Sequence, residues 1–357
     1  MIAPPSILIR ADAGERIGTG HVMRMIALAQ AYQDRGGTVT IASVVCPDAI
    51  VERVRREKID FKRVATNDLG STADLNLTIA CAGSIGAKWV VLDGYHFGLE
   101  YQRALRKSGF KVLAVDDYGH CETWAADAVL NQNIFATELK YHSEVEGCRF
   151  LLGTKFALLR REFRMEAENR HTVRESDASK KARQPIRRLL VTLGGSDVDN
   201  VTGRLLVALN SLPELRLEIK ALVGGGNPHL EKLRQLASAS PHSIGLLQNV
   251  VDMPSMYRWA DGVISAGGST CWEWLFFHLP AAVVCLAENQ RRVVAALERH
   301  RLAIVLSGRE NLNSDASRQT LRSLLECCDD LIMRPPQNFE IDGGGAGRVA
   351  LLLGGSL

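Results

Sequence analysis

The chain has 357 residues, which is long for one ordinary domain and predicts two domains of medium size. Its formal charge of +3 is small for this length and aromatic residues make up only 6%, so a nucleic-acid-binding surface is not indicated. The eight cysteines form no C-x-x-C pair, which favours a reduced, cytoplasmic protein without a cysteine zinc site. Because no leader-like segment begins the sequence and no run reaches the ~18 apolar residues that span a bilayer, we expect a soluble protein.

The first predicted elements are an apolar strand at residues 7–9 and a glycine-punctuated turn that carries His21 between Gly20 and a helix. The helix is predicted from apolar residues at i, i+3, i+4 and i+7, and it ends before a pair of glycines. These apolar residues are Met25, Leu28, Ala29 and Tyr32. His21 therefore falls on the first helical turn, at the carboxyl edge of a strand, where α/β sheets bind ligands and helix N–H groups favour anions.

This turn has two other interpretations. A polar residue flanked by glycines after a strand is often only a helix cap. The spacing is not that of a dinucleotide-binding motif, because Met23 stands where that motif has glycine or alanine. A nicotinamide cofactor is therefore not expected.

Further along the first half, apolar runs alternate with amphipathic segments, which predicts a parallel sheet covered on both faces. The predicted strands are Thr38–Val45, Trp89–Leu92, Val112–Val115 and Ala128–Leu130. Residues 166–187 are rich in charged residues of both signs and predict an exposed linker. We therefore expect an N-terminal domain over residues 1–165.

A second α/β series follows the linker and predicts another domain over residues 188–341. Its predicted strands are Arg188–Leu193, Leu217–Val223, Ile244–Leu247, Gly262–Ser265 and Ala281–Leu286. The last segment, residues 342–357, is expected to form a helix that returns to the first domain. The two halves share the order strand, glycine turn, helix, so each is expected to present ligand loops at the carboxyl ends of its strands.

Three motifs in the second half favour the binding of a nucleotide. Gly194, Gly195 and Ser196 follow a strand and offer glycine backbone that a phosphate can approach. A second glycine-hydroxyl turn is made of Gly267, Gly268, Ser269 and Thr270, and Glu273 follows it on the next helix. A carboxylate such as that of Glu273 can accept hydrogen bonds from the two hydroxyls of a ribose, as it does in many nucleotide sites. Asn289 and Gln290 also follow a strand.

Asp197-Val198-Asp199 spells the D-x-D motif of metal-dependent glycosyltransferases. We interpret these aspartates as capping and first-turn residues of a helix, and predict no metal site. Histidines at ligand spacing are also lacking, since no two histidines stand at i, i+4.

Taken together, the motifs resemble those of the UDP-sugar hydrolase family of pseudaminic acid biosynthesis. The resemblance rests on the following segments: 10–24 with Gly18-x-Gly20-His21-x-x-Arg24, Leu151 to Phe163, Gly194 to Asp197, Ser265 to Glu273, Asn289-Gln290, and Asp342 to Arg348. It covers nearly the whole chain outside the linker. Departures lie in the longer linker and in residues 91–96 and 116–117, which match the sugar-side segments of the family less completely.

This resemblance implies two Rossmann-like domains that face each other across a cleft, a glycosyltransferase-B-like fold. Members of the family release UDP from UDP-2,4-diacetamido-2,4,6-trideoxy-β-L-altropyranose by attack of water at the anomeric carbon, with inversion and without a metal or cofactor. The family's catalytic histidine matches His21. Its UDP-binding loops match Gly194–Asp197 and Ser265–Glu273, and its asparagine–glutamine pair matches Asn289 and Gln290. The expected partner is the UDP-sugar substrate, with no obligate protein partner evident.

The chemistry of the residues agrees with this expectation. A histidine can take the proton of the attacking water, and helix N-termini can stabilise a departing diphosphate. On the sugar side we assign Asp12 to orienting the His21 ring or the sugar, and Arg24 to the helix or the phosphates. Asp93 and Tyr95, at another strand end, are candidates to bind the sugar. Each of these four residues has a purely structural alternative.

His96 and His120 are second-choice candidates for the base, because they fall in predicted ligand loops. Two other functions remain open. One is a transferase that uses the same hold on the UDP-sugar and a non-water acceptor. The other is a non-catalytic sugar-nucleotide-binding protein, for which the His21 motif would be unnecessary.

Overall fold

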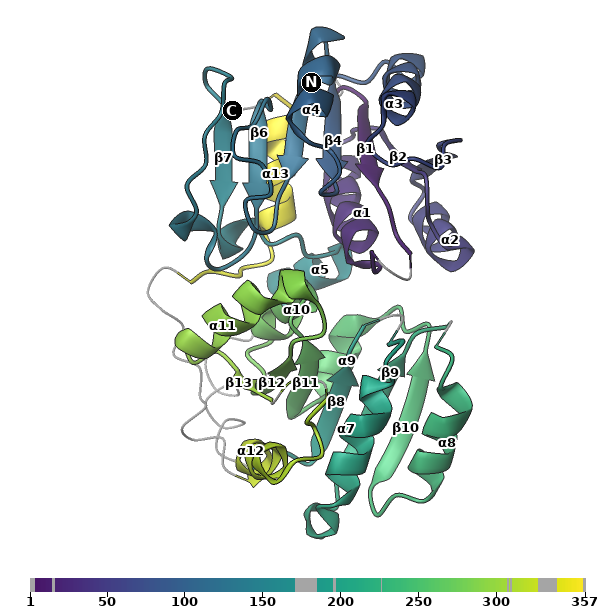
Figure 1. The fold of residues 1–357 in the computed structure, drawn as a ribbon, viewed down its shortest axis with the longest axis vertical. Coiled ribbons are helices and arrows are strands. Elements are labelled where there is room, and N and C mark those ends of the chain that lie inside the picture. Colours follow the sequence, from purple (N-terminus) through teal and green to yellow (C-terminus); the bar gives the residue numbers. More distant parts are fainter. Residues whose placement is uncertain are drawn as a thin grey trace. The chain divides into compact units, whose positions relative to one another are not determined.

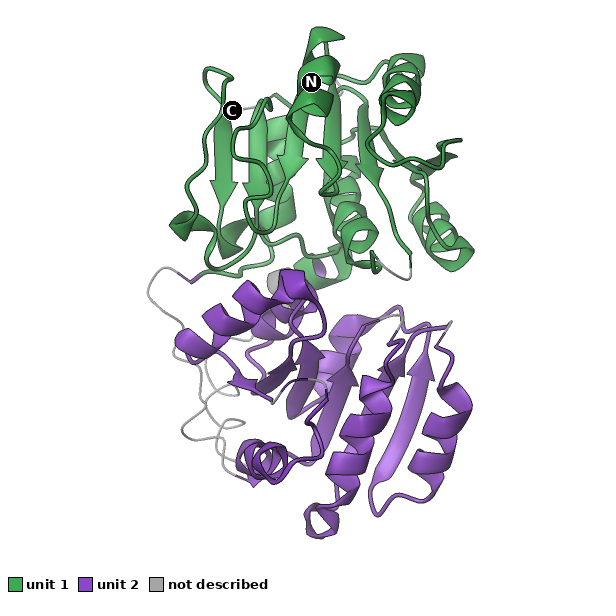
Figure 2. Cartoon of the chain, in the orientation of Figure 1, with its two compact units in different colours: residues 1–164, 340–357 green, residues 165–339 purple. Residues whose placement is uncertain are grey.

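The structure, a computed structural model, describes residues 4–14, 17–170, 185–194, 197–225, 227–306, 308, 310–326 and 339–355. The chain divides into two compact units, which are coloured separately in Figure 2. Unit 1 comprises residues 1–164 and 340–357, and unit 2 comprises residues 165–339. The polypeptide therefore leaves unit 1, forms unit 2 and returns to unit 1.

Unit 1 is built on a seven-stranded sheet in the order β3-β2-β1-β4-β5-β6-β7, and all of its strand pairs are parallel. The strands are β1 (Ile7–Ala11), β2 (Val39–Ser43), β3 (Asp60–Arg63), β4 (Trp89–Asp93), β5 (Lys111–Val115), β6 (Ala128–Asn131) and β7 (Arg149–Leu152). The helices are α1 (Gly20–Gln33), α2 (Asp48–Arg56), α3 (Thr72–Ser84), α4 (Leu99–Lys107) and α13 (Gly345–Leu353), with short 3₁₀ turns η1 (Ala136–Glu138) and η2 (Thr154–Phe156). Helix α5 (Arg161–Arg170) begins in unit 1 and ends in unit 2. Figure 1 labels most of these elements.

Both faces of this sheet are covered, as the continuous apolar runs of its strands require. Successive residues of β1 alternate between two clusters of buried side chains. Ile7 and Ile9 pack with α1 and α13, whereas Leu8 packs with residues of α4. All five residues of β1 are fully buried, so the strand serves as the centre of unit 1.

The predicted helix after the glycine turn is confirmed as α1. Its C-terminal end is marked by Gly36 at φ +82°, a backbone conformation that favours glycine. The expected linker is partly different from the prediction, because residues up to Arg170 belong to α5. A charged composition does not prevent a helix, since arginine, glutamate, methionine and alanine all favour one. Residues 171–184 of that segment lie outside the described residues.

Unit 2 has a six-stranded sheet in the order β10-β9-β8-β11-β12-β13, again with parallel pairs. The strands are β8 (Arg188–Thr192), β9 (Glu218–Val223), β10 (Ser243–Gln248), β11 (Gly262–Ala266), β12 (Ala281–Val284) and β13 (Ile304–Val305). The helices are α7 (Val201–Asn210), α8 (Leu230–Ser238), α9 (Met253–Trp259), α10 (Thr270–Phe276), α11 (Arg291–Arg299) and α12 (Asp315–Glu326), with 3₁₀ turns η3 (Pro213–Leu215) and η4 (Glu288–Gln290). The predicted class, two parallel-sheet α/β domains, is confirmed.

Within the part of the chain that the structure describes, no helix has the length and apolar character needed to cross a bilayer.

Candidate functional site

The glycine turn between β1 and α1 places His21 at the carboxyl edge of the unit 1 sheet. Gly14 and Gly18 exchange backbone hydrogen bonds of 3.2 and 2.7 Å, which close the turn. Gly18 has φ +77°, so a residue with a side chain would be strained there. Glu15 and Arg16 lie outside the described residues. Gly20 begins α1, and the His21 side chain that follows is 8% exposed.

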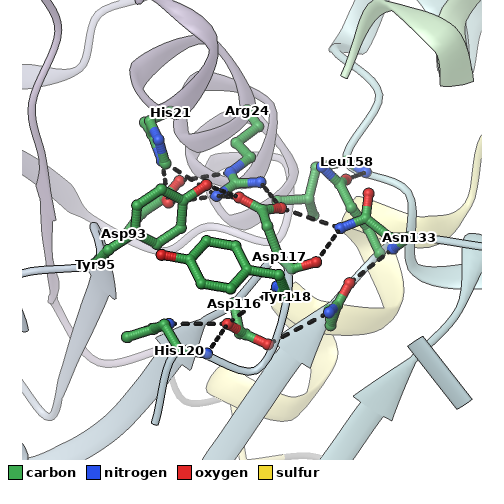
Figure 3. Close-up of polar contacts among 12 residues, drawn as sticks. His21, Arg24, Asp93, Tyr95, Asp116, Asp117, Tyr118, His120, Asn133 and Leu158 are labelled. Atoms are coloured by element: carbon green, nitrogen blue, oxygen red, sulfur yellow. Dashed lines mark hydrogen bonds and ion pairs between the residues drawn. The ribbon is translucent and has the colours of Figure 1, made fainter. Parts of the chain in front are cut away.

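A carboxylate from the neighbouring strand holds the His21 ring. Nδ1 of His21 lies 2.6 Å from Oδ1 of Asp93, the last residue of β4 (Figure 3). Nη2 of Arg24 also lies 3.1 Å from the same Nδ1. An ionised carboxylate only accepts hydrogen bonds, so we assign the ring proton to Nδ1, which leaves Nε2 as the basic atom.

Arg24 stands one turn after His21 on α1 and joins two carboxylates. Its Nε and Nη2 donate to Asp93 at 2.7 and 2.6 Å. Its Nη1 and Nη2 donate to Asp117 at 2.7 and 2.9 Å. Asp117 follows β5, the strand that pairs with β4. In this structure the Arg24 guanidinium belongs to an ion-pair cluster, and its assignment to the helix or the phosphates stays a prediction.

Tyr95 completes the group of residues around His21. Its hydroxyl donates to Oδ2 of Asp117 at 2.7 Å. Its ring meets the His21 ring edge-on, with centroids 5.4 Å apart, and it also contacts the ring of Tyr118. Figure 3 shows Tyr95 and Tyr118 side by side below His21. We name His21, Arg24, Asp93, Tyr95 and Asp117 the His21 cluster.

The electrostatics of the His21 cluster keep its carboxylates ionised. Burial by itself raises the pKa of Asp93 and of Asp117. The positive charge of Arg24 and its hydrogen bonds outweigh burial, so the pKa of each carboxyl falls below its ordinary value. Asp93 is consequently a charged acceptor for the Nδ1 proton of His21 throughout the neutral range.

A second histidine–carboxylate pair lies beside the first. Nδ1 of His120 is 2.8 Å from Oδ1 of Asp116, whose other oxygen accepts from the Tyr141 hydroxyl at 2.6 Å. Burial lowers the pKa of His120, but the hydrogen bonds to Asp116 and Cys121 outweigh it and raise that pKa to about 9. His120 is therefore held as an ion-pair partner, which does not suit it to act as the base.

Asp12 has a different environment from the one predicted. Its Oδ1 accepts from the backbone N–H groups of Val44 and Val45 at 2.7 and 2.9 Å, and its side chain is 1% exposed. The structure gives the contact with the His21 ring to Asp93 instead. His96 faces Asp12 at 3.6 Å, and burial lowers the pKa of His96.

Sequence analysis did not single out Asp117, although it noted the pair Asp116–Asp117 among the segments that match the family less completely. One signal was available, because both aspartates directly follow the apolar run of β5. Polar residues at this position of a parallel strand belong to the ligand-binding edge.

In unit 2 the structure brings together two of the predicted motifs. A Cβ atom added to Gly267 would lie 2.4 Å from Cγ2 of Val294 and 3.3 Å from Cβ of Gln290. The Gln290 side chain is fixed there, because its Oε1 accepts from the backbone N–H of Leu286 at 3.0 Å. Glu273, on α10, accepts from the Tyr257 hydroxyl at 3.1 Å. Gly268 is also next to Gln290.

The other predicted nucleotide motif is described only in part, because Gly195 and Ser196 lie outside the described residues. Gly194 follows β8 with φ +98°. Asp197 accepts from the backbone N–H groups of Val201 and Thr202 at 2.6 and 3.0 Å, at the start of α7. Asp197 thus accepts hydrogen bonds from the first turn of α7, whose N-cap residue is Asn200, with its side chain accepting from the backbone N–H of Gly203. Ser269, Thr270 and Gln290 are half-buried, and Asn289 is exposed.

Two sheets of parallel strands, each with loops at its carboxyl edge, define the class: this is a two-domain protein of the glycosyltransferase-B-like fold. Residues 189–339 match the family model described as the glycosyltransferase family 28 C-terminal domain. MurG of Acinetobacter baumannii has a similar structure, at 18% identity and a TM-score of 0.61, with 98% of this chain and 99% of MurG covered. The UDP-GlcNAc 2-epimerase of Neisseria meningitidis, solved with UDP-GlcNAc, gives a TM-score of 0.60 at 9% identity, with 98% and 99% covered.

Sequence relatives confirm the resemblance seen in the motifs. The UDP-2,4-diacetamido-2,4,6-trideoxy-β-L-altropyranose hydrolase of Campylobacter jejuni is 23% identical over 80% of this chain and 93% of its own length. The spore coat polysaccharide biosynthesis protein SpsG of Bacillus subtilis is 23% identical over 79% of this chain and 78% of its own. The protein MJ1062 of Methanocaldococcus jannaschii is 24% identical over 80% of this chain. The match spans 56% of that archaeal relative, so this chain corresponds to about half of its length.

Proposed function

We propose that this protein is a UDP-sugar hydrolase that releases UDP and free sugar from a UDP-linked 2,4-diacetamido-2,4,6-trideoxy sugar, with inversion at the anomeric carbon. The product would feed the biosynthesis of a nonulosonic acid such as pseudaminic acid. The observation that carries the proposal is the hydrogen-bond pair of His21 and Asp93, which presents a basic ring nitrogen at the ligand-binding edge of unit 1. The names of the Campylobacter and Bacillus relatives support a UDP-sugar or polysaccharide substrate.

In the proposed reaction, Nε2 of His21 takes a proton from water while the water oxygen forms a bond to the anomeric carbon. The bond between that carbon and the UDP oxygen breaks, and its electron pair leaves with UDP. Asp93 stabilises the imidazolium that forms, because its carboxylate accepts the Nδ1 proton at 2.6 Å. A positioned base of this kind contributes roughly 10²–10⁴-fold in rate.

The proposed UDP site is in unit 2. It comprises Gly194, Gly195, Ser196, Gly267, Gly268, Ser269, Thr270 and Glu273, with Asn289 and Gln290 beside it. Glycines allow the diphosphate to approach the backbone closely, and the Glu273 carboxylate is proposed to bind the ribose diol. The packing of Gly267 against Gln290 supports a single site made from both segments.

A second candidate function is a transferase that delivers the sugar to an acceptor other than water. The match of residues 189–339 to a glycosyltransferase C-terminal domain favours it. Both functions use the same UDP-sugar, and they differ in whether UDP is released when water is the only acceptor.

The deciding experiment follows UDP-2,4-diacetamido-2,4,6-trideoxy-β-L-altropyranose by phosphorus and proton NMR, with the protein treated with a chelator. We expect release of UDP together with a free sugar whose anomeric configuration is inverted. Replacement of His21 by alanine should lower kcat by about 10²–10⁴-fold and leave the affinity for UDP unchanged. The matched control is His142→Ala, an exposed histidine of unit 1, which should behave as wild type. Binding of the sugar nucleotide without release of UDP would overturn the hydrolase and favour the transferase.

A further inference from the structure

The strongest unexplained feature of unit 1 is an arginine that buries its charge between two carboxylates. Four hydrogen bonds of 2.6–2.9 Å run from Arg24 to Asp93 and Asp117. Its side chain is 6% exposed, and those of the two aspartates are 0% and 14% exposed. A guanidinium engaged in this way has little capacity left for a ligand.

We infer that Arg24 is a positioning residue: it keeps Asp93 and Asp117 ionised side by side, and through them fixes the ring of His21 and the hydroxyl of Tyr95. The inference rests on the proposed function, because it assigns a role in the proposed proton transfer. The five residues of the His21 cluster are joined by an unbroken series of contacts. Asp93 holds the His21 ring, Asp117 holds Tyr95, Tyr95 packs on His21, and Arg24 joins both carboxylates.

The charges around His21 explain why a cation is needed. Helix α1 contributes Arg24, β4 and its following loop contribute Asp93, Tyr95 and His96, and the loop after β5 contributes Asp117. Arg24, Asp93 and Asp117 carry one positive and two negative charges, and the ion pair of Asp116 with His120, in the same loop as Asp117, adds no net charge. Two carboxylates this close together, one fully buried and the other 14% exposed, cannot both stay ionised without a cation, so one of them would take up a proton.

Loss of the Asp93 charge would act directly on the base. A protonated Asp93 carries an O–H group that can itself donate to Nδ1 of His21. It would then no longer hold the ring proton on Nδ1. The acidic limb of the pH–rate profile reports uptake of a proton by the His21–Asp93 pair, and removal of Arg24 leaves two carboxylates without a counter-ion beside that pair, which favours this uptake at higher pH. In the wild type Arg24 lowers the pKa values of Asp93 and Asp117 through its charge and its hydrogen bonds.

Three variants separate charge from packing. Arg24→Met removes the cation, Asp117→Asn removes one carboxylate but keeps an oxygen that accepts from Tyr95, and the double variant removes one charge of each sign. We expect Arg24→Met to move the acidic limb of kcat/KM upward by about one pH unit or more. The double variant should move back toward wild type, and Asp117→Asn alone should leave the limb unchanged or lower it. Arg161→Met, an arginine that pairs with Asp34, is the control.

A readout that does not need turnover keeps the two proposals apart. In protein labelled at the aspartate carboxyl carbons, NMR signals of Asp93 and Asp117 should show no titration between pH 5 and 8 in wild type. In Arg24→Met at least one of them should titrate in that range. If the wild type shows this behaviour but releases no UDP, the proposed function fails while the role of Arg24 as the counter-ion stands.

If Arg24→Met folds poorly, the stabilities of the single and double variants can be compared instead of their pH profiles. A variant with two buried carboxylates and no cation should be less stable than the charge-balanced double variant. The inference is overturned if Arg24→Met leaves the carboxyl titrations and the acidic limb unchanged. It is equally overturned if the double variant is no closer to wild type than Arg24→Met in pH profile and in stability.

Discussion

At the residue scale, Asp93 and Asp12 are both buried aspartates at strand ends, yet their contacts predict different losses. Asp93→Asn would present the His21 ring with an amide, whose N–H₂ favours the wrong ring tautomer, so we expect kcat to fall by about 10²–10⁴-fold. Asp12→Asn weakens the hydrogen bonds to the Val44 and Val45 backbone, so its main effect should be a loss of about 1–3 kcal/mol of stability. Steady-state kinetics and urea unfolding of both variants test this. The assignment is wrong if Asp12→Asn has the larger effect on kcat.

His120 predicts a loss of stability at alkaline pH. Its folded-state pKa is raised to about 9, above the ~6.5 of an unfolded histidine. The stabilisation from its ion pair with Asp116 is therefore fully present below pH ~6.5 and is lost as pH rises through about 9. The neighbouring carboxyls Asp93, Asp116 and Asp117 have lowered pKa values, so their contributions are lost only in acid. Hydrogen exchange of residues 116–120 between pH 6.5 and 9.5 measures the effect, and His120→Gln should abolish the difference.

The sequence predicts His21, Arg24, Asp93 and Tyr95 as candidate site residues, but it does not predict the contacts among them. A glycine turn followed by a helical pattern is local information, and it is sufficient to place His21 on the first turn of α1. The partners of Arg24 are 69 and 93 residues away in the chain, and only the strand order β1-β4-β5 brings them together. The sequence by itself therefore predicts that Arg24 serves the helix or the phosphates, and that Asp12 orients the His21 ring or the sugar.

At the element scale, the close packing of β11, α10 and α11 predicts the effect of a single added methyl group. Gly267→Ala would place its Cβ 2.4 Å from Val294, so α11 or the turn must move, and the proposed UDP site with it. We expect UDP affinity to fall by about tenfold or more, and Gly267→Ala combined with Val294→Ala to recover part of it. Calorimetric titration with UDP measures both. Gly245→Ala in β10, outside the proposed UDP site, is the matched control, since its added Cβ would lie 3.9 Å from the carbonyl oxygen of Ile219. Equal affinities in all variants would argue against a role for this turn.

Every strand predicted from the sequence is confirmed, and the strands that were not predicted, β3, β7 and β13, all lie at sheet edges. Strands covered on both faces are continuous apolar runs. The edge strand β10 was predicted as well, because its partly buried segment still carries Ile244, Leu246 and Leu247. β3 has the sequence Asp60–Arg63 with only Phe61 apolar, since one of its sides is open to solvent. β13 has two residues. β7 carries a leucine pair but was read only as part of a motif. Because edge strands are less buried than central strands, their sequences need no continuous run of apolar residues.

In the whole molecule, segments that are far apart in the sequence belong to the same unit. Residues 345–353 follow unit 2 in the chain, yet α13 packs on α1 in unit 1. Gly345 is needed at the start of α13, because a Cβ there would lie 2.3 Å from the carbonyl oxygen of Ala157. Three consecutive glycines made this start uncertain from the sequence, since glycine disfavours a helix interior.

This path predicts that a substitution near the end of the chain weakens the N-terminal unit. Leu353 is 1% exposed and belongs to the apolar cluster of β1 and α1, so Leu353→Ala should cost about 2–5 kcal/mol of local stability. Its matched control is Leu324→Ala, a fully buried leucine of α12 in the core of unit 2. Hydrogen exchange followed by mass spectrometry should show faster exchange in peptides of β1 and α1 for Leu353→Ala, and in peptides of β8 and α7 for Leu324→Ala. Because α1 carries His21 and Arg24 of the His21 cluster, Leu353→Ala should also lower hydrolysis while leaving UDP affinity unchanged. Faster exchange in β8 and α7 on replacing Leu353 would show that α13 stabilises the other unit.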